Sequence, residues 1–544
     1  MKILLAQINT TVGAIDDNMR KAREAMQQAR TMGAELCVFP EMTITGYPPL
    51  DLLEYDWFIE KNEQALRELA AVTDDSLGAI IGYVARRNTQ GSKALMNSAA
   101  LIGGGRVISR HDKTLLPTYD VFDEGRWFHP AHSVQPAVWR GVRFGVGICE
   151  DYWGGAAGVR HPNCDLRPIA TLAAQGADLL LSISASPYTL GKRAIRRGIY
   201  SGAARRHHLP VAQVNLAGGN DSLVFDGWSN VYNPAGEIVA QAADFKEDLL
   251  LFELDTLSGP VHPTAQSDEE EVYHALCLGL RDYVRKCGFK KVVIGLSGGI
   301  DSALTAALAV AALGAENVTG VSMPSRYSSD HSKDDARVLA ENLGIEYLTI
   351  PIEGMFGAFL DGLSPAFAGR EPDVTEENIQ ARCRGIVLMA LSNKFGSLVL
   401  STGNKSEMAV GYATLYGDMC GGVSLISDLP KLWVYRLSRW INREREIIPW
   451  NTIEKPPSAE LRPDQKDSDS LPEYATLDPI ITKYVEEFKS VEQIIAEGAD
   501  DATVRRVIRM INVNEYKRRQ AAPNIKITGK AFGHGRRMPI AAKY

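Results

Sequence analysis

The sequence has 544 residues, and its 45% hydrophobic and 23% charged content is ordinary for a globular protein with a sizeable core. The formal net charge of -7 argues against nucleic-acid binding, which normally needs a basic surface. The N-terminus M-K-I-L-L-A-Q-I-N is too short and too polar for a signal peptide, and no apolar run approaches the ~18 residues that span a bilayer. We therefore expect a soluble, cytoplasmic protein with no nucleic-acid and no membrane partner.

Residues 1–255 are predicted to form many apolar strands, with helices between some of them. The strands are expected at residues 2–9, 35–40, 77–85, 97–102, 143–149, 178–186, 210–216 and 248–255. Helices are expected at residues 17–32, closed by Gly33, and around residues 168–175 and 192–208. Two stacked sheets flanked by helices, an α-β-β-α sandwich, accommodate this many strands.

Residues 256–268 interrupt this pattern with glycine, two prolines and polar residues, as interdomain linkers do. Strands are then expected at 291–296, 317–323, 346–352 and 398–402, and helices at 269–288, 301–313, 329–343 and 375–394. Strands separated by helices of this length pair in parallel, so residues 269–544 are predicted to form a doubly wound parallel sheet. Such sheets bind ligands beyond the carboxyl ends of their strands. Residues 455–476, rich in proline, aspartate and serine, are the one long loop expected, and long loops often cover active sites.

Three residues at the ends of predicted strands of the first domain form a complete amide-cleaving set. They are Glu41 in F-P-E-M-T-I-T-G-Y, Lys113 in R-H-D-K-T-L-L-P and Cys149 in G-I-C-E-D-Y-W. The carboxylate can remove the thiol proton, the thiolate can attack an amide carbon, and the ammonium can stabilise the oxyanion that develops. Each residue alone also has an ordinary explanation, as a core cysteine, a surface lysine or an exposed turn glutamate. Glu150 is a second carboxylate whose role, in catalysis or in positioning the backbone, stays open.

These strings resemble the Glu–Lys–Cys triad of the nitrilase superfamily, and the resemblance covers nearly all of residues 1–255. It implies a nitrilase-like sandwich that acts as a glutaminase. It also implies that glutamine is bound by Tyr119 in L-P-T-Y-D-V-F-D-E, Ser186 in S-A-S-P-Y and Lys192 in L-G-K-R. Without the resemblance, strand-end and helix-start roles explain Ser186 and Lys192 equally well.

In the second domain, the segment S-G-G-I-D-S (297–302) follows a predicted buried strand and opens an alanine-rich helix. Gly298 and Gly299 let the backbone approach a ligand closely, and the helix N-terminus offers N–H groups that favour an anion. No Gly-Lys-Ser/Thr follows, which excludes a Walker loop. A tight strand-to-helix connection is the alternative explanation of the two glycines. The whole string resembles the pyrophosphate loop of the ATP-pyrophosphatases, which adenylate a carboxyl or carbonyl oxygen and release pyrophosphate.

A second polar string, S-T-G-N-K-S-E (401–407), also follows a buried strand, so its side chains are expected in the same crevice. Glu407 and Asp301 are expected to hold a magnesium ion, although helix capping also explains Asp301. Four further strings are E-N-I-Q-A-R, D-L-P-K-L-W-V-Y-R-L, N-E-Y-K-R-R-Q and G-H-G-R-R-M-P-I. Together they resemble the NAD synthetase domain in its glutamine-dependent form, whose fold is adenine nucleotide alpha hydrolase-like.

This second resemblance implies the residues of an adenylation site. The implied ATP contacts are Gly295, Leu296, Ser297, Gly298, Gly299, Ile300, Asp301, Ser302, Thr402 and Lys431. Asn378, Glu407 and Lys517 are implied to bind deamido-NAD or its metal. The loop P-S-A-E-L-R-P-D-Q-K-D-S-D-S-L-P-E-Y is implied to cover the site. Domains of this family form dimers, so we expect a homo-oligomer of at least two chains.

The cysteines and the basic residues add little to this assignment. The seven cysteines are scattered and lack C-x-x-C spacing, at positions 37, 149, 164, 277, 287, 383 and 420. A disulfide framework and a zinc ribbon are therefore not expected, and a reducing cytosol fits best. The basic runs 517–519 and 536–537 are open to two explanations, an anionic small molecule or a solvated helix face.

Both resemblances together, in this order along the chain, imply a glutamine-dependent NAD synthetase with domains at 1–255 and 269–544 and a linker at 256–268. It would take L-glutamine, ATP, Mg²⁺ and deamido-NAD. The nearest alternative changes the acceptor, as in GMP or asparagine synthesis, but those families use other types of glutaminase. A hydrolase with a nucleotide sensor is a second alternative, which the presence of Thr402, Glu407 and Lys517 disfavours. A non-catalytic scaffold is a third.

Overall fold

The computed structural model describes residues 1–87, 94–154, 166–463 and 465–542. It consists of two compact units, Met1–Asp268 and Glu269–Tyr544. Cys164 and Asp464, the latter in the predicted cover loop, lie outside the described residues. Each of the six described cysteines is a free thiol. Within the described ranges, no helix combines the length and apolar character needed to cross a membrane.

The first unit contains two six-stranded sheets. One has the order β14 (Asp248–Glu253), β1 (Lys2–Gln7), β2 (Leu36–Val38), β3 (Gly78–Arg86), β4 (Leu95–Gly103) and β5 (Arg106–Asp112). The other has the order β13 (Ile238–Gln241), β12 (Asn230–Tyr232), β9 (Val211–Asn215), β8 (Leu179–Ser184), β7 (Val142–Ile148) and β6 (Ala137–Trp139). The central strands of each sheet pair in parallel and the outer ones antiparallel. A small hairpin, β10 (Ala217–Asn220) and β11 (Leu223–Asp226), completes the unit.

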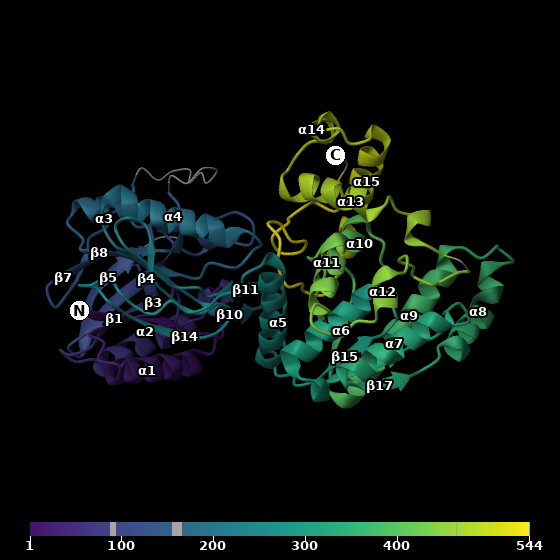
Figure 1. Ribbon diagram of the computed structural model, residues 1–544, viewed down its shortest axis with the longest axis horizontal. Coiled ribbons are helices and arrows are strands. Elements are labelled where there is room, and N and C mark those ends of the chain that lie inside the picture. Colours follow the sequence, from purple (N-terminus) through teal and green to yellow (C-terminus); the bar gives the residue numbers. More distant parts are fainter. Residues whose placement is uncertain (88–93, 155–165, 464, 543–544) are drawn as a thin grey trace. The chain divides into compact units, whose positions relative to one another are not determined.

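Alternation along the strands decides which layer each side chain enters. Ile3 and Leu5 of β1 belong to the core between the two sheets, whereas Leu4 packs in the cluster beneath the helices α1 (Ile15–Thr31) and α2 (Asp56–Ala71). Successive side chains of a strand point to opposite faces, so a strand with both faces covered is apolar throughout. Helices α3 (Pro168–Ala174) and α4 (Lys192–His207) cover the other sheet (Figure 1). The predicted α-β-β-α sandwich is confirmed.

Some elements of this unit are absent from the sequence prediction, namely α2 and the strands β5, β6, β10, β11, β12 and β13. Residues 256–268, predicted as a linker, are packed on the first unit. The amide of Gln241 donates to the carbonyl of Pro260 (2.9 Å), and the His262 ring lies 2.6 Å from the Asp248 carboxylate. Proline and glycine therefore mark here an irregular segment that is held by hydrogen bonds.

The second unit is built on one parallel sheet with the order β17 (Glu346–Thr349), β16 (Val318–Ser322), β15 (Val292–Gly295), β18 (Leu398–Ser401) and β19 (Val423–Ser424). Its helices include α5 (Asp268–Lys286), α6 (Ile300–Leu313), α7 (Asp330–Leu343) and α9 (Val374–Phe395), close to the predicted ranges. The chain runs outward from β15 to β17 and then returns to β18 on the other side. The predicted doubly wound sheet is confirmed, and its order reverses beside the S-G-G-I-D-S loop.

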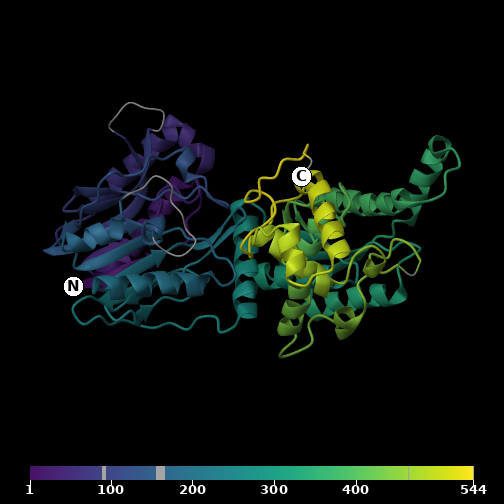
Figure 2. The same ribbon diagram turned by 90° about the horizontal axis from the view of Figure 1, so that it is seen from above.

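A group of C-terminal helices adds a second core to this unit. α10 (Lys405–Val410), α13 (Tyr474–Ile481), α14 (Val491–Ala496) and α15 (Asp501–Val513) share one apolar cluster that includes Met408, Leu477 and Val507. α11 (Lys431–Ile441) packs against α13, α12 (Trp450–Glu454) packs against α11, α6 and α7, and α16 (Glu515–Arg518) packs against α15. The C-terminal helices drawn in yellow stand together in Figures 1 and 2. These helices, and α8 (Glu353–Phe367), are absent from the sequence prediction.

Two candidate active sites

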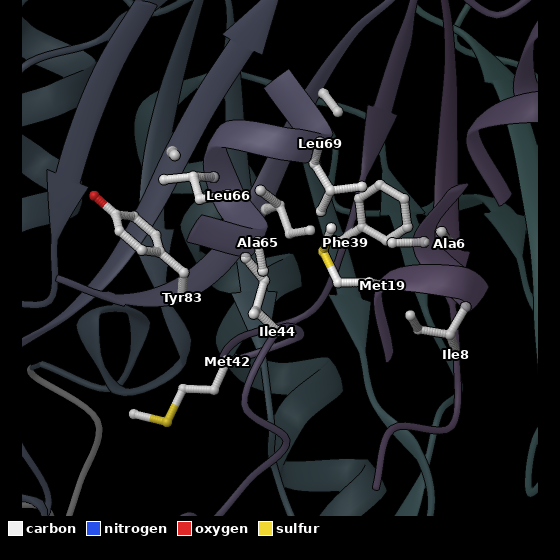
Figure 3. Close-up of a cluster of buried hydrophobic side chains, with 14 of the residues drawn as sticks. Ala6, Ile8, Met19, Phe39, Met42, Ile44, Ala65, Leu66, Leu69 and Tyr83 are labelled. Carbon is white, nitrogen blue, oxygen red and sulfur yellow. The ribbon is translucent and has the colours of Figure 1, made fainter. Parts of the chain in front are cut away.

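In the first unit, Glu41 sits in a loop after β2 that the core holds rigidly. Met42 and Ile44 anchor this loop in the apolar cluster shown in Figure 3. Strand β3 passes so close that a Cβ on Gly82 would lie 2.3 Å from the amide nitrogen of Met42 and 2.5 Å from the carbonyl oxygen of Pro40. Only glycine fits such a backbone approach. The Glu41 side chain is thereby fixed in a buried position, 1% exposed.

Glu41, Lys113 and a further carboxylate, Glu124, form one buried cluster. The Lys113 Nζ donates to an oxygen of Glu41 at 2.8 Å and to an oxygen of Glu124 at 2.8 Å. The side-chain amide of Asn97 donates to the same two carboxylates, at 2.7 Å and 3.3 Å. The backbone amide of Ala185, which directly follows β8, donates to the second oxygen of Glu41 at 2.9 Å. Segments from both sheets thus converge on one carboxylate.

Burial and charge act against each other in this cluster. Burial by itself would lower the pKa of Lys113, but the carboxylates of Glu124 and Glu41 raise it well above its usual value. Burial raises the pKa of Glu124 to about 7, against the opposing effect of Lys113. A buried charge is costly unless it is paired and hydrogen-bonded, so this ammonium depends on both partners.

Cys149 lies at the turn where β7 passes into a short 3-10 helix. Its backbone has φ +45°, a left-handed conformation that costs non-glycine residues about 1–3 kcal/mol and is common at functional sites. Burial, followed by the charge of Glu41, raises the pKa of the thiol well above its usual value, while Lys113 lowers it. The electrostatic coupling places Cys149 in the same cluster as Glu41 and Lys113. A neutral thiol beside a carboxylate needs that carboxylate to accept its proton before it can attack.

Asp151 fixes the turn that carries the thiol. Its carboxylate accepts from the backbone amide of Ile148 at 2.9 Å, and also from those of Thr114 and Leu115 at 3.0 and 2.9 Å. The segment just after Lys113 and the turn around Cys149 are therefore joined through one buried side chain. Asp151 positions the backbone here, whereas Glu150 accepts a hydrogen bond from the Tyr119 hydroxyl at 2.9 Å.

The three predicted glutamine contacts surround this cluster. Tyr119 is 44% exposed and packs edge-on against Phe122. The Lys192 ammonium lies 5.9 Å from the Phe122 ring and 5.6 Å from the Trp153 ring, and it donates to the carbonyl of Pro187 at 2.9 Å. Ser186 directly follows Ala185, and its buried hydroxyl has no hydrogen-bond partner among the described residues.

In the second unit, the S-G-G-I-D-S loop leads from β15 into α6. Gly298 has φ +79°, and a Cβ there would lie 2.2 Å from the carbonyl oxygen of Ser332, so both its conformation and its surroundings demand glycine. The Ser302 hydroxyl donates to the carbonyl of Gly299 at 2.9 Å. It also lies 3.2 Å from the hydroxyl of Ser297. These bonds fold the loop into a cradle at the start of a 14-residue helix.

A cavity of about 290 Å³ lies at this end of the sheet. Most of the predicted ATP contacts line it, namely Gly295, Leu296, Ser297, Gly299, Ile300, Asp301, Ser302, Thr402 and Lys431. Gly298 is not among the lining residues because it packs against Ser332. The predicted cover loop contributes residues 455–461 and Asp467 to the wall.

Asp301, Glu407 and Lys431 meet at the cavity wall. The Lys431 ammonium contacts a carboxylate oxygen of Asp301 and lies 3.4 Å from one of Glu407. Burial and the charge of Asp301 raise the pKa of Glu407 to about 8. Burial alone would lower the pKa of Lys431, but Asp301 and Glu407 raise it. The structure thus brings together both carboxylates predicted to hold the metal, and the Lys431 ammonium contacts both of them.

The carboxylate pair fits a magnesium ion that also binds phosphate. Among the described residues, no group of three or more histidine, cysteine, aspartate or glutamate side chains is arranged so that it could hold a metal ion. Magnesium at nucleotide sites commonly uses one or two carboxylates together with phosphate oxygens and water. Asp301 and Glu407 supply two carboxylates beside a phosphate-sized cradle.

Asn378 of α9 and Lys517 of α16 lie outside the lining of this cavity, but both contact the segment 411–414. The hydroxyl of Thr414 donates to Asn378 at 2.7 Å, and the Lys517 ammonium donates to the carbonyls of Gly411 and Ala413 at 2.7 and 2.8 Å. They adjoin the cavity through this segment, because Tyr412 is one of its lining residues.

The basic runs near the C-terminus are partly buried. Arg518 and Arg536 both pair with the buried Glu515, at 2.8 and 2.7 Å, so these two arginines are neither a solvated face nor free for an anion. The two guanidinium groups share this one carboxylate inside the unit.

Several site residues are missing from the sequence prediction. Glu124 stands at the end of the string L-P-T-Y-D-V-F-D-E, and nothing in its spacing distinguishes it from a surface glutamate. Asp151 is equally inconspicuous in the string C-E-D-Y-W, beside another carboxylate. Asn404 did carry a signal, because asparagine followed three residues later by glutamate is the pattern of a helix-capping box.

Both units match families of known proteins. Residues 2–259 match the carbon-nitrogen hydrolase family, and residues 272–521 match the NAD synthase family. A glutamine-dependent NAD(+) synthetase from Synechocystis sp. is 47% identical, with 100% of this chain and 99% of that protein covered. One from Thermotoga maritima is 44% identical, with 100% and 99% covered.

A solved structure is similar over nearly the whole chain. It is the glutamine-dependent NAD(+) synthetase from Acinetobacter baumannii in complex with adenosine diphosphate. The identity is 40% and the TM-score 0.78, with 99% of this chain and 98% of that one covered. The order of the two units is thus shared with relatives of the same length.

Replacing Glu150 by Gln is expected to lower the pKa of Cys149, because the negative charge of Glu150 raises it. At a fixed pH near 8, the thiolate fraction and therefore the rate of Cys149 alkylation by iodoacetamide should rise, because the thiolate is the reactive form of the side chain. Mass spectrometry of the Cys149 peptide measures the rate, and the exposed Cys287 serves as a reference in the same sample. An unchanged rate at Cys149 contradicts an electrostatic role of Glu150.

Proposed function

Because the chain belongs to the glutamine-dependent NAD(+) synthetases, we propose that it converts deamido-NAD(+) to NAD(+) with ATP and with nitrogen from L-glutamine. The observation that carries this proposal is the presence of two complementary sites in one chain. One is the buried Glu41–Lys113–Cys149 cluster, and the other is the S-G-G-I-D-S cradle on a cavity of about 290 Å³. The products are NAD(+), AMP, pyrophosphate and glutamate.

At the first site, Glu41 takes the proton of the Cys149 thiol as the sulfur attacks the side-chain amide carbon of glutamine. Lys113 donates to the oxyanion that forms, and Glu41 returns the proton to the departing nitrogen. The carbon–nitrogen bond breaks, ammonia leaves, and a γ-glutamyl thioester remains. Water, deprotonated by Glu41, then releases glutamate and restores the thiol. Tyr119, Ser186 and Lys192 are the proposed contacts that hold glutamine.

At the second site, a carboxylate oxygen of the nicotinate group attacks the α-phosphorus of ATP, and pyrophosphate departs. The loop 295–302 and Thr402 hold ATP, and Lys431 donates to its phosphates. Asp301 and Glu407 would hold Mg²⁺, which supplies charge neutralisation for the departing pyrophosphate. Ammonia then attacks the adenylated carboxyl carbon, AMP leaves, and the amide of NAD(+) remains. Asn378, Glu407 and Lys517 are the proposed contacts to deamido-NAD(+).

A homo-oligomer that forms through the second unit accounts for an apolar surface on α9. Ile386 and Met389, which lie three residues apart on one face of that helix, are 55% and 39% exposed. Exposed apolar groups that cluster in this way mark interaction sites more often than isolated ones do.

Sedimentation equilibrium is expected to give a multiple of the 59.5 kDa chain mass. Replacing Ile386 by Asp should weaken the association, because the new charge would have to be buried without a partner. Val107, which is 40% exposed on a strand of the first unit, offers a control position for the same substitution. A wild-type protein that sediments as a monomer contradicts this assignment.

Replacing Cys149 by Ala is expected to abolish glutamine-driven NAD(+) formation, by about 10⁴-fold or more, as loss of a nucleophile typically does. Synthesis from ammonium chloride should persist, because Cys149 has no part in adenylation. The two rates are measured side by side with ATP, Mg²⁺ and deamido-NAD(+). Loss of both activities would contradict the assignment of separate tasks to the two units.

Replacing Asp301 by Ala is expected to slow release of pyrophosphate by about 10²-fold or more, because a metal ion contributes several kcal/mol to such transition states. Glutaminase turnover at the other site should remain measurable. A coupled phosphate assay follows the first activity and glutamate release the second. Pyrophosphate release at the wild-type rate would remove Asp301 from the adenylation chemistry.

A further inference from the structure

The turn that begins α10 holds three parts of the adenylation site together. Asn404 caps this helix, since its side-chain oxygen accepts from the amide of Glu407 at 3.0 Å. The Glu407 side chain in turn accepts from the amide of Asn404 at 3.2 Å. A reciprocal cap of this kind fixes Glu407 at the cavity wall. This cap uses only the oxygen of the Asn404 side chain and leaves its amide nitrogen available for another partner.

The other end of Asn404 reaches the S-G-G-I-D-S loop. Its amide nitrogen donates to Oδ1 of Asp301 at 2.9 Å, while Oδ2 of the same carboxylate contacts the Lys431 ammonium. Each oxygen of Asp301 thus has its own donor, so the carboxylate plane is held from both sides. Asn404 is fully buried, which makes this bond costly to leave unmade.

Ser406, two residues further on, controls the position of Lys431. The Ser406 hydroxyl accepts from the backbone amide of Lys431 at 2.9 Å and donates to the Asp478 carboxylate. The second oxygen of Asp478 accepts from the amide of Leu432 at 2.9 Å. The first two amides of α11, which α-helices leave without internal partners, are therefore bound to α10 and α13.

Lys405, between these two residues, ties the turn to the rest of the unit. Its ammonium is fully buried and lies 3.1 Å from the Asp428 carboxylate and 2.7 Å from that of Glu486. Asp428 also accepts from the amides of Ile527 and Thr528, both at 2.7 Å. The turn is thereby anchored against a distant segment of the chain and has little freedom to follow a moving ligand.

We infer that Asn404 and Ser406 are positioning residues for adenylation. Asn404 sets the orientation of the Asp301 carboxylate, and Ser406 sets the place from which Lys431 reaches the same carboxylate. Neither residue acts on the substrate itself, since each works through a hydrogen bond to a proposed ligand-binding residue. This inference rests on the proposed function of the second unit.

The substitution Asn404→Ser separates the two tasks of Asn404. Serine caps helices about as well as asparagine, so the cap is kept, but its side chain is too short to reach Asp301. We expect the Mg²⁺ concentration for half-maximal NAD(+) synthesis from ammonia to rise about 10–100-fold, the usual effect of losing a hydrogen bond behind a metal ligand. The KM for deamido-NAD(+) and the thermal midpoint should stay near the wild-type values.

The substitution Ser406→Ala gives an independent test on the other arm. It removes the acceptor for the Lys431 amide, so the KM for ATP should rise more than the Mg²⁺ requirement does. Asp500→Ala is the matched control, because it also deletes a helix cap of this unit, at α15. The control should lower the thermal midpoint while leaving both constants unchanged.

The outcomes separate this inference from the function on which it rests. Wild-type Mg²⁺ and ATP constants in Asn404→Ser and Ser406→Ala overturn the inference alone. The inference is also overturned if Asp500→Ala changes the Mg²⁺ and ATP constants as much, for a given loss of thermal midpoint, as Asn404→Ser and Ser406→Ala do. Loss of helix capping would then explain the kinetic changes. A wild-type protein that makes no NAD(+) from ammonia, ATP, Mg²⁺ and deamido-NAD(+) overturns the proposed function as well.

Discussion

The first unit depends on the ion pairs that the buried ammonium of Lys113 forms with two carboxylates. An unpaired ammonium in an apolar interior is so unfavourable that it loses its proton or drives the site open. Here it is paired with Glu41 and Glu124, both at 2.8 Å, and Asn97 bridges the same carboxylates. Glu41 lies in the loop after β2, and Lys113 directly follows β5. Glu124 begins a 3-10 helix, and Asn97 belongs to β4. The ammonium therefore gains all its partners only when the sheet is fully assembled.

The second unit also contains a buried lysine that is paired with carboxylates, Lys431, but its surroundings differ. Lys431 forms ion pairs with Asp301 and Glu407, and both of these carboxylates line a cavity. Burial raises the pKa of Glu407 to about 8, and the charge of Asp301 adds to this effect, whereas Lys431 opposes it. The purely structural charges lie elsewhere, at Lys405 and Asp428, where every partner is supplied by the protein. Lys405 and Asp428 are thus buried inside the unit, whereas Asp301 and Glu407 line its cavity.

The fold was accessible from the sequence to the extent that local pattern determines it. Val292–Gly295 and Leu398–Ser401 are short apolar runs between helices, and the parallel sheet follows from them. α2 carries buried Phe58, Leu66 and Leu69 at helical spacing, so a strict periodicity count would have found it. Glu124 and Asp478 carry no such signal, because their roles depend on contacts with residues far along the chain that only the folded structure creates.

The two units place different demands on their key acidic groups, and the geometry meets each of them. In the proposed reaction, Glu41 exchanges a proton with sulfur and then with nitrogen, so its carboxylate needs a fixed position while its protonation changes. Three donors on its two oxygens and the tight passage of Gly82 behind its loop provide that fixity. Asp301 exchanges no proton in the proposed reaction, in which it would help to hold Mg²⁺, so the orientation of its carboxylate matters more than its proton affinity. Its two separate donors, one neutral and one charged, suit that need, since the neutral amide of Asn404 orients the carboxylate without cancelling its charge.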